Sequence, residues 1–201
     1  MELEHFNEIE QYLLGLEQPS IQLNQLLEKA WFRKPPFLEL YQLSKTQQSE
    51  KHHPEGDAWK HTMLVVNEAA KVKNQSSNPR AFMWAAFLHD IGKPETTKKY
   101  KGRITAYNHD VVGAKKAEQF LRHFRQSEDF VHLTCAYVRW HMMILYVLKD
   151  LPYGDVTQMR RDISPNEVAL LGWCDRMGRL HADSLVEKEA IEQFLRKVKL
   201  R

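Results

Sequence analysis

The sequence predicts an all-α fold, a helical bundle with additional helices at its N-terminus. Apolar residues recur at intervals of three and four along most segments, as in amphipathic helices, whereas the alternation typical of strands is rare. Two segments also begin with a polar residue followed by proline, a pattern that starts helices. The chain has 201 residues, 43% hydrophobic and 27% charged, which is the composition of an ordinary globular domain.

Local signals place the boundaries of the helices expected in the N-terminal half. Pro35-Pro36 ends one helix, because proline cannot continue it, and a polar loop is expected over 46–56. Asp57 is a suitable N-cap for the next helix, and Asn78-Pro79 opens the one after it. The predicted helices of this half span residues 4–16, 20–32, 37–46, 58–72 and 79–88.

The C-terminal half contains the strongest helix start of the chain. Ser164-Pro165-Asn166-Glu167 combines an N-cap, a proline at the first helical position and a glutamate at the third. Residues 102–107 are expected to be irregular or a short extended piece, and the basic run 98–101 to be a solvated loop near the pocket that could touch a nucleotide backbone. The predicted helices of this half span residues 110–125, 127–142, 164–179 and 183–199.

Charge and cysteine content exclude several classes of protein. The net charge of +3 is too small to indicate nucleic-acid binding, although it would not repel a phosphorylated substrate. No apolar run approaches the roughly 20 residues of a membrane span, and the first residues are acidic and unlike a signal peptide. Cys135 and Cys174 show no metal or disulfide spacing. We therefore expect a cytoplasmic protein without membrane association, whose oligomeric state the sequence does not define.

The run Leu88-His89-Asp90-Ile91-Gly92-Lys93-Pro94 is the most informative segment, because its imidazole and carboxylate can bind one divalent cation. Helical spacing aims His89 into the core at the end of its helix. His61 can face inward from the first turn of the helix over 58–72. Asp175 lies among apolar residues, where a carboxylate would cost several kcal/mol unless it were paired or bound to a metal.

These residues form a candidate metal site, with a second one beside it. His61, His89, Asp90 and Asp175 would leave coordination positions open for water and substrate. The nitrogen and oxygen donors suit Mn, Fe, Co, Ni, Mg or Zn, and the lack of thiolates argues against a structural zinc. The residues proposed for a second ion are His109 and His141, with Asp90 as the bridge. Two ions about 3.5–4 Å apart would clamp a phosphoryl group.

Other polar residues are candidates for substrate contacts. Lys93 is placed to neutralise a phosphate oxygen and is, with Asp90, a candidate catalytic residue. Glu55 and Asp57 could line the pocket mouth, but Asp57 could also serve only as a helix cap. Arg103 and Arg139 are candidate phosphate contacts or ordinary surface arginines.

The order of these residues resembles that of the HD-domain metal-dependent phosphohydrolases. Across roughly residues 50–180, the chain is most similar to the HD domain attached to bacterial CCA-adding tRNA nucleotidyltransferases and to its stand-alone relatives. The phrases that carry the resemblance are His53-Pro54-Glu55-Gly56-Asp57, His61-Thr62, His89-Asp90-Ile91-Gly92-Lys93-Pro94, Gly102-Arg103-Ile104-Thr105, and Asn108-His109-Asp110 with Gly113.

The resemblance implies an HD domain over 51–201, on which the helical segment 1–50 packs to give one compact domain. It also implies that His61, His89, Asp90 and Asp175 bind a metal, and that His109 and His141 hold a second. Relatives often carry two adjacent histidines where this chain has Trp140-His141. The 201 residues contain no nucleotidyltransferase motif, so only the hydrolase half is implied, and no Gly-Tyr-Pro signature of cyclic-di-GMP phosphodiesterases.

The expected function is therefore hydrolysis of a phosphomonoester or phosphodiester by a metal-activated water. The expected partner is a small phosphorylated substrate, a nucleotide or an RNA terminus. One alternative is a metal- or nucleotide-binding regulatory module without turnover. Another is an HD protein that uses a diiron centre for oxygen chemistry, which Lys93 and the CCA-type phrases disfavour.

Overall fold

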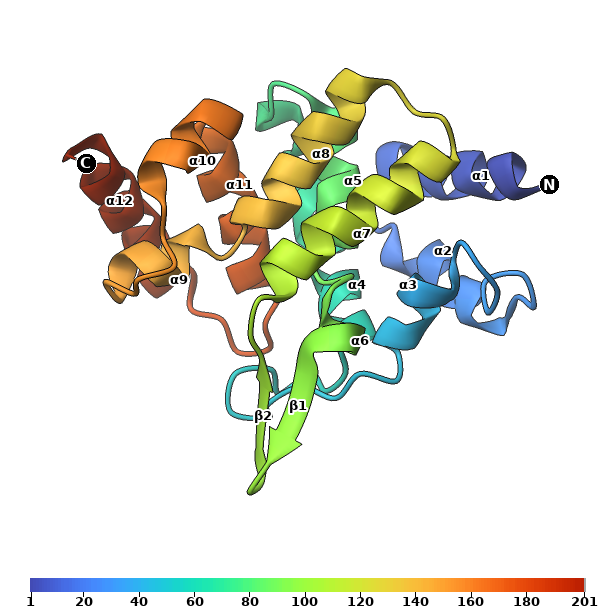
Figure 1. The fold of residues 1–201 in the computed structure, drawn as a ribbon, viewed down its shortest axis with the longest axis horizontal. Helices are drawn as coiled ribbons and strands as arrows, with labels where there is room; N and C mark the ends of the chain where they lie inside the picture. Colours follow the sequence, from blue (N-terminus) through green and yellow to red (C-terminus); the bar gives the residue numbers. More distant parts are fainter. Residues whose placement is uncertain (201) are drawn as a thin grey trace.

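The computed structural model describes residues 1–200 and has the all-α architecture that the sequence predicts (Figure 1). The first half contains α1 (Glu2–Gly15), α2 (Ser20–Gln25), the 3-10 turn η1 (Leu26–Glu28), α3 (Leu38–Leu43), α4 (Ala58–Val72), the 3-10 turn η2 (Lys73–Gln75) and α5 (Pro79–Leu88). The second half contains α6 (Lys93–Thr96), β1 (Thr97–Tyr100), β2 (Arg103–Ala106), α7 (His109–His123), α8 (Glu128–Trp140), α9 (Met143–Leu148), α10 (Val156–Asp162), α11 (Pro165–Met177) and α12 (Ser184–Leu200).

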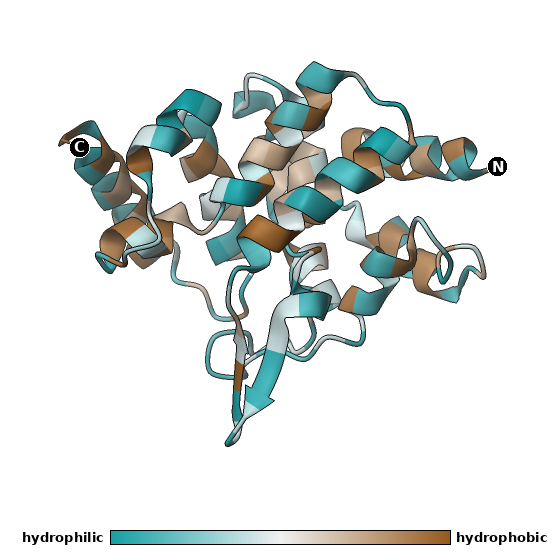
Figure 2. Cartoon of the chain, in the orientation of Figure 1, coloured by the Kyte–Doolittle hydropathy of each residue, from teal (hydrophilic) through white to brown (hydrophobic). Residues whose placement is uncertain are grey.

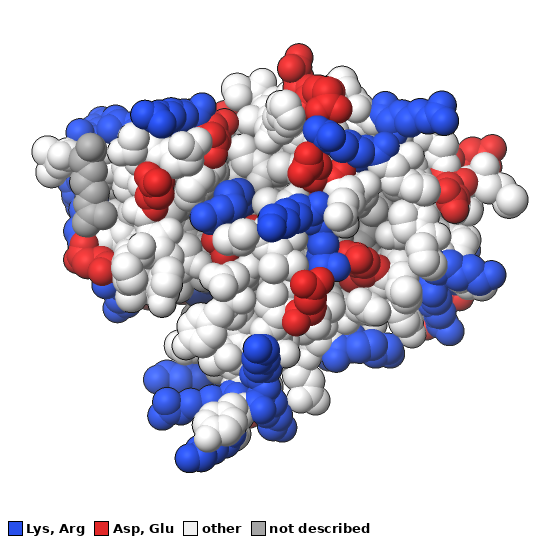
Figure 3. All heavy atoms as spheres, viewed as in Figure 1, with Lys and Arg blue, Asp and Glu red and all other residues white. Residues whose placement is uncertain are grey.

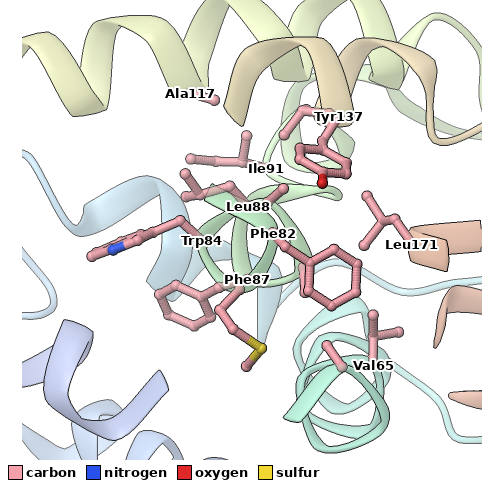
Figure 4. Close-up of a cluster of buried hydrophobic side chains, with 14 of the residues drawn as sticks. Val65, Phe82, Trp84, Phe87, Leu88, Ile91, Ala117, Tyr137 and Leu171 are labelled. Carbon is pink, nitrogen blue, oxygen red and sulfur yellow. The ribbon is translucent and has the colours of Figure 1, made fainter. Parts of the chain in front are cut away.

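Helix α5 lies at the centre of the fold. Every side chain from Ala81 to Leu88 is buried, as expected for a helix that is apolar on all sides. In Figure 4 this helix is surrounded by Val65 of α4, Tyr137 of α8 and Leu171 of α11. Each large apolar side chain buried in this way contributes about 1.5–3 kcal/mol. The packing therefore gives the C-terminal end of α5 a rigid position.

The N-terminal helices pack on the same core. The ring of Phe6 in α1 stacks on that of Trp84 in α5, with 4.3 Å between centroids, and the Trp84 indole donates to Glu10 at 2.8 Å. Between α2 and α4, Trp59 donates to Asn24 at 2.9 Å. These contacts join residues 1–50 to the helices that follow.

The helix starts predicted from capping residues are confirmed. The carboxylate of Asp57 accepts a hydrogen bond from the Lys60 amide at 2.9 Å, and the side chain of Asn78 accepts one from the Ala81 amide at 3.0 Å. Ser164 likewise caps α11. These side chains satisfy amides that have no partner within the helix.

The single helix predicted over 20–32 is wrong. Helix α2 ends at Gln25, and after η1 the chain turns so that Phe32 packs against Phe37 and Trp59, with centroids 6.1 and 5.6 Å apart. A straight helix could not place Phe32 in this aromatic cluster. Helices α9 and α10 were not predicted, and both lie in a stretch where the sequence analysis assigned no element.

The loop predicted over 98–101 is also wrong, because this run forms β1 and a tight turn. Strand β1 pairs antiparallel with β2, in the stretch predicted as irregular or extended. Lys101 and Gly102 both have positive φ angles, of 45° and 76°, which let the chain reverse over two residues. The hairpin projects from the helical body and is largely hydrophilic (Figures 1 and 2).

The longest helix, α12, is amphipathic and buries Phe194 and Val198. It contacts α9 and α11, and its exposed surface is mostly charged, with Leu185, Val186 and Leu200 exposed near its two ends. Among the described helices, none combines the length and apolarity that crossing a bilayer needs.

Both cysteine thiols are expected to react slowly in the folded protein. Burial raises the pKa of Cys135 to about 12 and raises that of Cys174 further above its ordinary value. Because the thiolate is the nucleophile, native Cys135 should contain about 10³-fold less reactive species than an ordinary cysteine at the same pH. Iodoacetamide labelling at pH 8, followed by mass spectrometry, measures this rate. Labelling in urea provides the control, and equal rates in both states would contradict the prediction.

Candidate metal centre

Four separate segments bring the first group of candidate ligands together. His61 lies in the first turn of α4, His89 and Asp90 directly follow α5, and Asp175 lies in the last turns of α11. Donor atoms of His61, His89 and Asp90 lie within 4.8 Å of one another. His61 Nε2 is also 2.9 Å from Asp175 Oδ1. The residues grouped by the sequence analysis are therefore neighbours in space, and all four are buried.

A second group shares Asp90 with the first. Donor atoms of Asp90, His109 and His141 lie within 4.8 Å of one another. His109 is the first residue of α7 and His141 directly follows α8, so the packing of these two helices sets their positions. The two Nε2 atoms are 3.1 Å apart, and His109 Nε2 is 3.6 Å from Asp90 Oδ1.

Three of the histidine rings are oriented in the same way. Each donates its Nδ1 hydrogen to the backbone carbonyl three residues earlier, His89 to Ala86 at 2.9 Å, His109 to Ala106 at 2.6 Å and His141 to Val138 at 2.7 Å. A carbonyl only accepts, so Nδ1 carries the hydrogen and the neutral ring presents a lone pair at Nε2. This second contact is how proteins orient metal-binding histidines.

The unpaired Nε2 lone pairs of these three histidines fit a bound cation. The Nε2 atom of His89 is buried and has no hydrogen-bond partner among the described residues. The Nε2 lone pairs of neutral His109 and His141 face each other at 3.1 Å, which is repulsive unless a proton or a cation lies near both. Buried nitrogen lone pairs without a partner are costly, and divalent ions held by the two ligand groups would satisfy all three.

His61 lies between two carboxylates. Its Nδ1 is 2.8 Å from Glu55 Oε1, and its Nε2 is 2.9 Å from Asp175 Oδ1. Burial acts to lower the pKa of His61, but the bonds to Asp175 and Glu55 outweigh it and the pKa is raised. The carboxylate–histidine pair formed with Glu55 is the arrangement that makes an imidazole a stronger ligand.

The two aspartates stay ionised despite their burial. Burial acts to raise the pKa of Asp90, but its interactions with the His89 ring and with the Lys93 ammonium hold the pKa well below its usual range. Burial also acts to raise the pKa of Asp175, but Arg179, 3.2 Å away, and His61 hold that pKa well below its usual range. Both carboxylates can therefore act as anionic ligands at neutral pH.

His109 and His141 stay neutral for the opposite reason. Burial, followed by the repulsion that a second protonated imidazole at His141 would cause, lowers the pKa of His109 to about 3. Burial and His89 lower the pKa of His141 as well. Neutral imidazole is the form that binds metals, so no deprotonation cost opposes ligation here.

A cavity of about 520 Å³ opens onto both groups. Asp90, His109, His141 and Asp175 line one end of it, and Lys93 Nζ lies 2.7 Å from Asp90 Oδ2. Another part of the lining is largely apolar and aromatic and is formed by residues 142–153 around α9. A cavity of this size and polarity suits a small organic phosphate.

The residues expected to contact substrate are placed differently from one another. Lys93 lines the cavity, whereas Glu55 is not part of the described lining and lies against His61, with 2.8 Å between its Oε1 and His61 Nδ1. Asp57 caps α4, and Arg103 lies exposed on β2; neither belongs to the described cavity lining. Arg139 pairs with Asp110 at 2.6 Å and lines a separate hollow of about 630 Å³ beside α7 and α8. Substrate contact by these residues stays a prediction.

The hydrogen-bond and ion-pair partners of several residues around the site have no signal in the sequence. Gln48 is buried and accepts a hydrogen bond from the Lys93 ammonium, although it lies in the polar stretch expected to be a loop. Arg179 pairs with the buried carboxylate of Asp175, which lies one helical turn earlier. Trp140, directly before His141, donates to Asp162 at 2.9 Å.

Replacing Asp57 with alanine should lower the free energy of unfolding by about 1 kcal/mol, because α4 loses its N-cap. Asp57→Asn should keep most of the stability, since asparagine caps equally well. Urea denaturation of the three proteins measures the difference. Equal stability of the alanine variant and the unchanged protein would show that the cap contributes nothing.

Comparison with known proteins agrees with this geometry. The HD domain family matches residues 58–180, the range that contains all six candidate ligands. The chain is 34% identical over 105 residues to the Multifunctional CCA protein of Actinobacillus pleuropneumoniae serotype 5b, covering 52% of this chain and 25% of that protein. It is 35% identical over 113 residues to that of Halorhodospira halophila, covering 56% and 25%.

The protein of the same name from Haemophilus ducreyi is 39% identical over 80 residues, covering 40% of this chain and 19% of the relative. The matched part is thus about a quarter or less of the curated relatives' length. The family match covers more than half of this chain and includes both ligand groups. The chain belongs to the HD domain family.

Proposed function

We propose that the protein is a metal-dependent phosphohydrolase that cleaves a phosphomonoester or phosphodiester of a nucleotide or an RNA terminus. The observation that carries the proposal is the convergence of buried histidine and aspartate donors on one cavity that also contains Lys93. Membership of the HD domain family supports metal-dependent hydrolysis. The relatives' name, Multifunctional CCA protein, supports a nucleotide or RNA substrate.

The ligand groups suggest how one or two ions would be held. His61, His89, Asp90 and Asp175 would hold the first, and Asp90, His109 and His141 the second. When bound, such ions supply Lewis acidity and lower the pKa of water towards about 7. The donor set suits Mn, Fe, Co, Ni, Mg or Zn, and the ion found in the cell depends on availability as well as affinity.

The protein's own residues would position the ester and stabilise its charge. The Lys93 ammonium, fixed between Asp90 and Gln48, faces the cavity and would offset negative charge on the phosphoryl oxygens. The apolar part of the cavity lining would exclude bulk water and hold the organic part of the substrate. In the reaction a water oxygen bonds to phosphorus, the ester P–O bond breaks, and the leaving oxygen takes up a proton.

A substrate panel tests the proposal directly. The purified protein, after elemental analysis, is assayed with nitrophenyl phosphate, bis-nitrophenyl phosphate and nucleotides in the presence of each candidate metal. We expect turnover that EDTA abolishes and one metal restores. Turnover of no substrate with any metal would overturn the proposal. A nucleotide-induced thermal shift would then favour a regulatory module, and oxygen consumption by an iron-loaded sample would favour oxygen chemistry.

Glu55→Gln should weaken metal binding by about 10–100-fold, because the residue paired with His61 loses its charge. Glutamine has nearly the same size and keeps an oxygen that can lie against His61 Nδ1, so the fold should persist. Isothermal titration with Mn²⁺ measures the affinity. Glu50→Gln, at an exposed position of the same segment, is the control and should bind normally. Unchanged affinity in Glu55→Gln would exclude a supporting role for this carboxylate.

A further inference from the structure

The β1–β2 hairpin carries a concentration of positive charge that the metal centre does not use. Residues 97–106 contain Lys98, Lys99, Lys101 and Arg103 and no acidic residue. All four cations are exposed, and none forms an ion pair with another described residue. Figure 3 shows Lys and Arg gathered on this projecting arm, whereas acidic and basic residues are mixed over the body in the same view.

The pairing of the strands places an aromatic ring among these cations. Residues directly opposite each other in antiparallel strands share a face, and every second residue of a strand returns to it. Lys98 is opposite Thr105, and Tyr100 is opposite Arg103, so these four share one face. Lys98 and Arg103 are diagonal neighbours about 7–8 Å apart. Lys101 follows Tyr100 at the turn, with its ammonium 5.4 Å from the centre of the tyrosine ring.

This face leads from the tip of the hairpin to the metal cavity. On this face Thr105 and Tyr107 line the cavity, and Ile104 and Ala106 line it from the other face of the strand. Tyr100 at the tip is 71% exposed and Tyr107 at the mouth is 73% exposed. The three residue steps along β2 from Arg103, opposite Tyr100, to Ala106 span about 10 Å of extended chain, and Tyr107 follows directly. Two exposed rings, with cations near the outer one, thus mark a path that ends where the candidate ligands lie.

The chemistry of this path fits a polynucleotide rather than a free nucleotide. Single-stranded nucleic acids are bound by cations that contact the phosphates and by aromatic rings on which the bases stack. A nucleotide held in the cavity would not reach Tyr100, whereas a longer strand would. Lysines on an exposed strand also prevent edge-to-edge pairing, but that role does not need two exposed tyrosines.

We propose that the hairpin is a docking surface for a single-stranded polynucleotide whose terminal phosphate enters the metal cavity. We call this surface the hairpin track and define it as Lys98, Tyr100, Lys101, Arg103, Thr105 and Tyr107. The entry of the terminal phosphate rests on the proposed hydrolase function. The binding of the strand does not.

Binding is tested with the full chain as purified and a fluorescein-labelled eight-nucleotide strand that carries a 3′ phosphate. Fluorescence anisotropy gives the Kd of RNA and DNA versions between 50 and 300 mM salt. For Lys98→Gln/Lys101→Gln, the slope of log binding constant against log salt should become less negative by about 1.4, since each phosphate contact contributes about 0.7. Tyr100→Ala should raise the Kd by about tenfold or more through lost stacking.

The matched control is Lys29→Gln/Lys188→Gln, which removes two exposed lysines outside the hairpin. It should change the Kd less than twofold and leave the salt slope nearly as in the unchanged protein. An equal loss of oligonucleotide affinity in the two double variants would overturn the proposal, because binding would then depend only on the net charge of the protein. Binding of phosphatidylserine vesicles but not of either oligonucleotide would also overturn it.

Kinetics separate this proposal from the proposed function. The hairpin double variant should raise the KM for the phosphate-terminated strand by about tenfold, with kcat and mononucleotide hydrolysis unchanged. If this variant hydrolysed the phosphate-terminated strand with an unchanged KM, the hairpin track would be refuted and the hydrolase proposal would stand. Strand binding through the hairpin without any hydrolysis would refute the hydrolase proposal and leave the track standing.

Discussion

Asp90→Asn is expected to reduce phosphohydrolase activity by about 10³-fold even at saturating metal. Asp90 is the one residue common to both ligand groups, and it also contacts Lys93 at 2.7 Å. Asparagine keeps the shape but removes the negative charge that would hold the ions. A bound metal stabilises the charge of the transition state by several kcal/mol. A 10³-fold loss of rate corresponds to an activation free energy raised by about 4 kcal/mol. Steady-state kinetics over a metal titration measures it.

The fold of this variant must be checked separately, because Lys93 loses a buried partner. Circular dichroism and thermal unfolding of the metal-free proteins make that comparison. Asp129→Asn, at an exposed position in the first turn of α8, is the matched substitution and should retain full activity. If folded Asp90→Asn hydrolysed substrate as fast as the Asp129 variant, Asp90 would have no part in the reaction.

Gly92→Ala should both destabilise the protein and impair the metal centre. A methyl group at this position would lie 2.2 Å from the His109 carbonyl oxygen and 2.6 Å from the Gly113 amide nitrogen. Both are backbone atoms that cannot rotate away, so the turn after α5 must separate from α7. Overpacking of this kind costs about 1–3 kcal/mol or more. The shift would also move His109 away from Asp90, because His109 begins α7.

Urea denaturation and Mn²⁺ titration measure the two effects of Gly92→Ala. Gly15→Ala, at the end of α1, is the control, because a methyl group there meets no atom within 4 Å. It should leave stability and metal affinity nearly unchanged. Normal stability of Gly92→Ala would mean that α7 can move without cost, contrary to the close backbone contact.

Local signals predicted the elements that local interactions determine. The starts of α4, α5 and α11 were predicted because Asp57, Asn78 and Ser164 bond to amides two or three residues away. Such interactions lie within one turn of the chain, so sequence alone contains them.

Predictions failed where distant contacts decide the structure. Phe32 packs with Trp59 from α4, and this contact explains why the helix expected over 20–32 is interrupted. Strand β1 is polar and shows no apolar alternation, so only its pairing with β2 identifies it. Gln48 could not be assigned to Lys93, since 45 residues separate them and no motif joins them.

The sequence by itself determined the helical class, the main caps and the identity of the six candidate ligands, because periodicity, capping and ligand chemistry are properties of residue types and their spacing. Only the tertiary structure decided that Asp175 lies against His61, 114 residues away, that Glu55 supports His61, and that the basic hairpin leads into the same cavity. These relations depend on how helices pack around α5, and packing is a collective property that no single segment specifies.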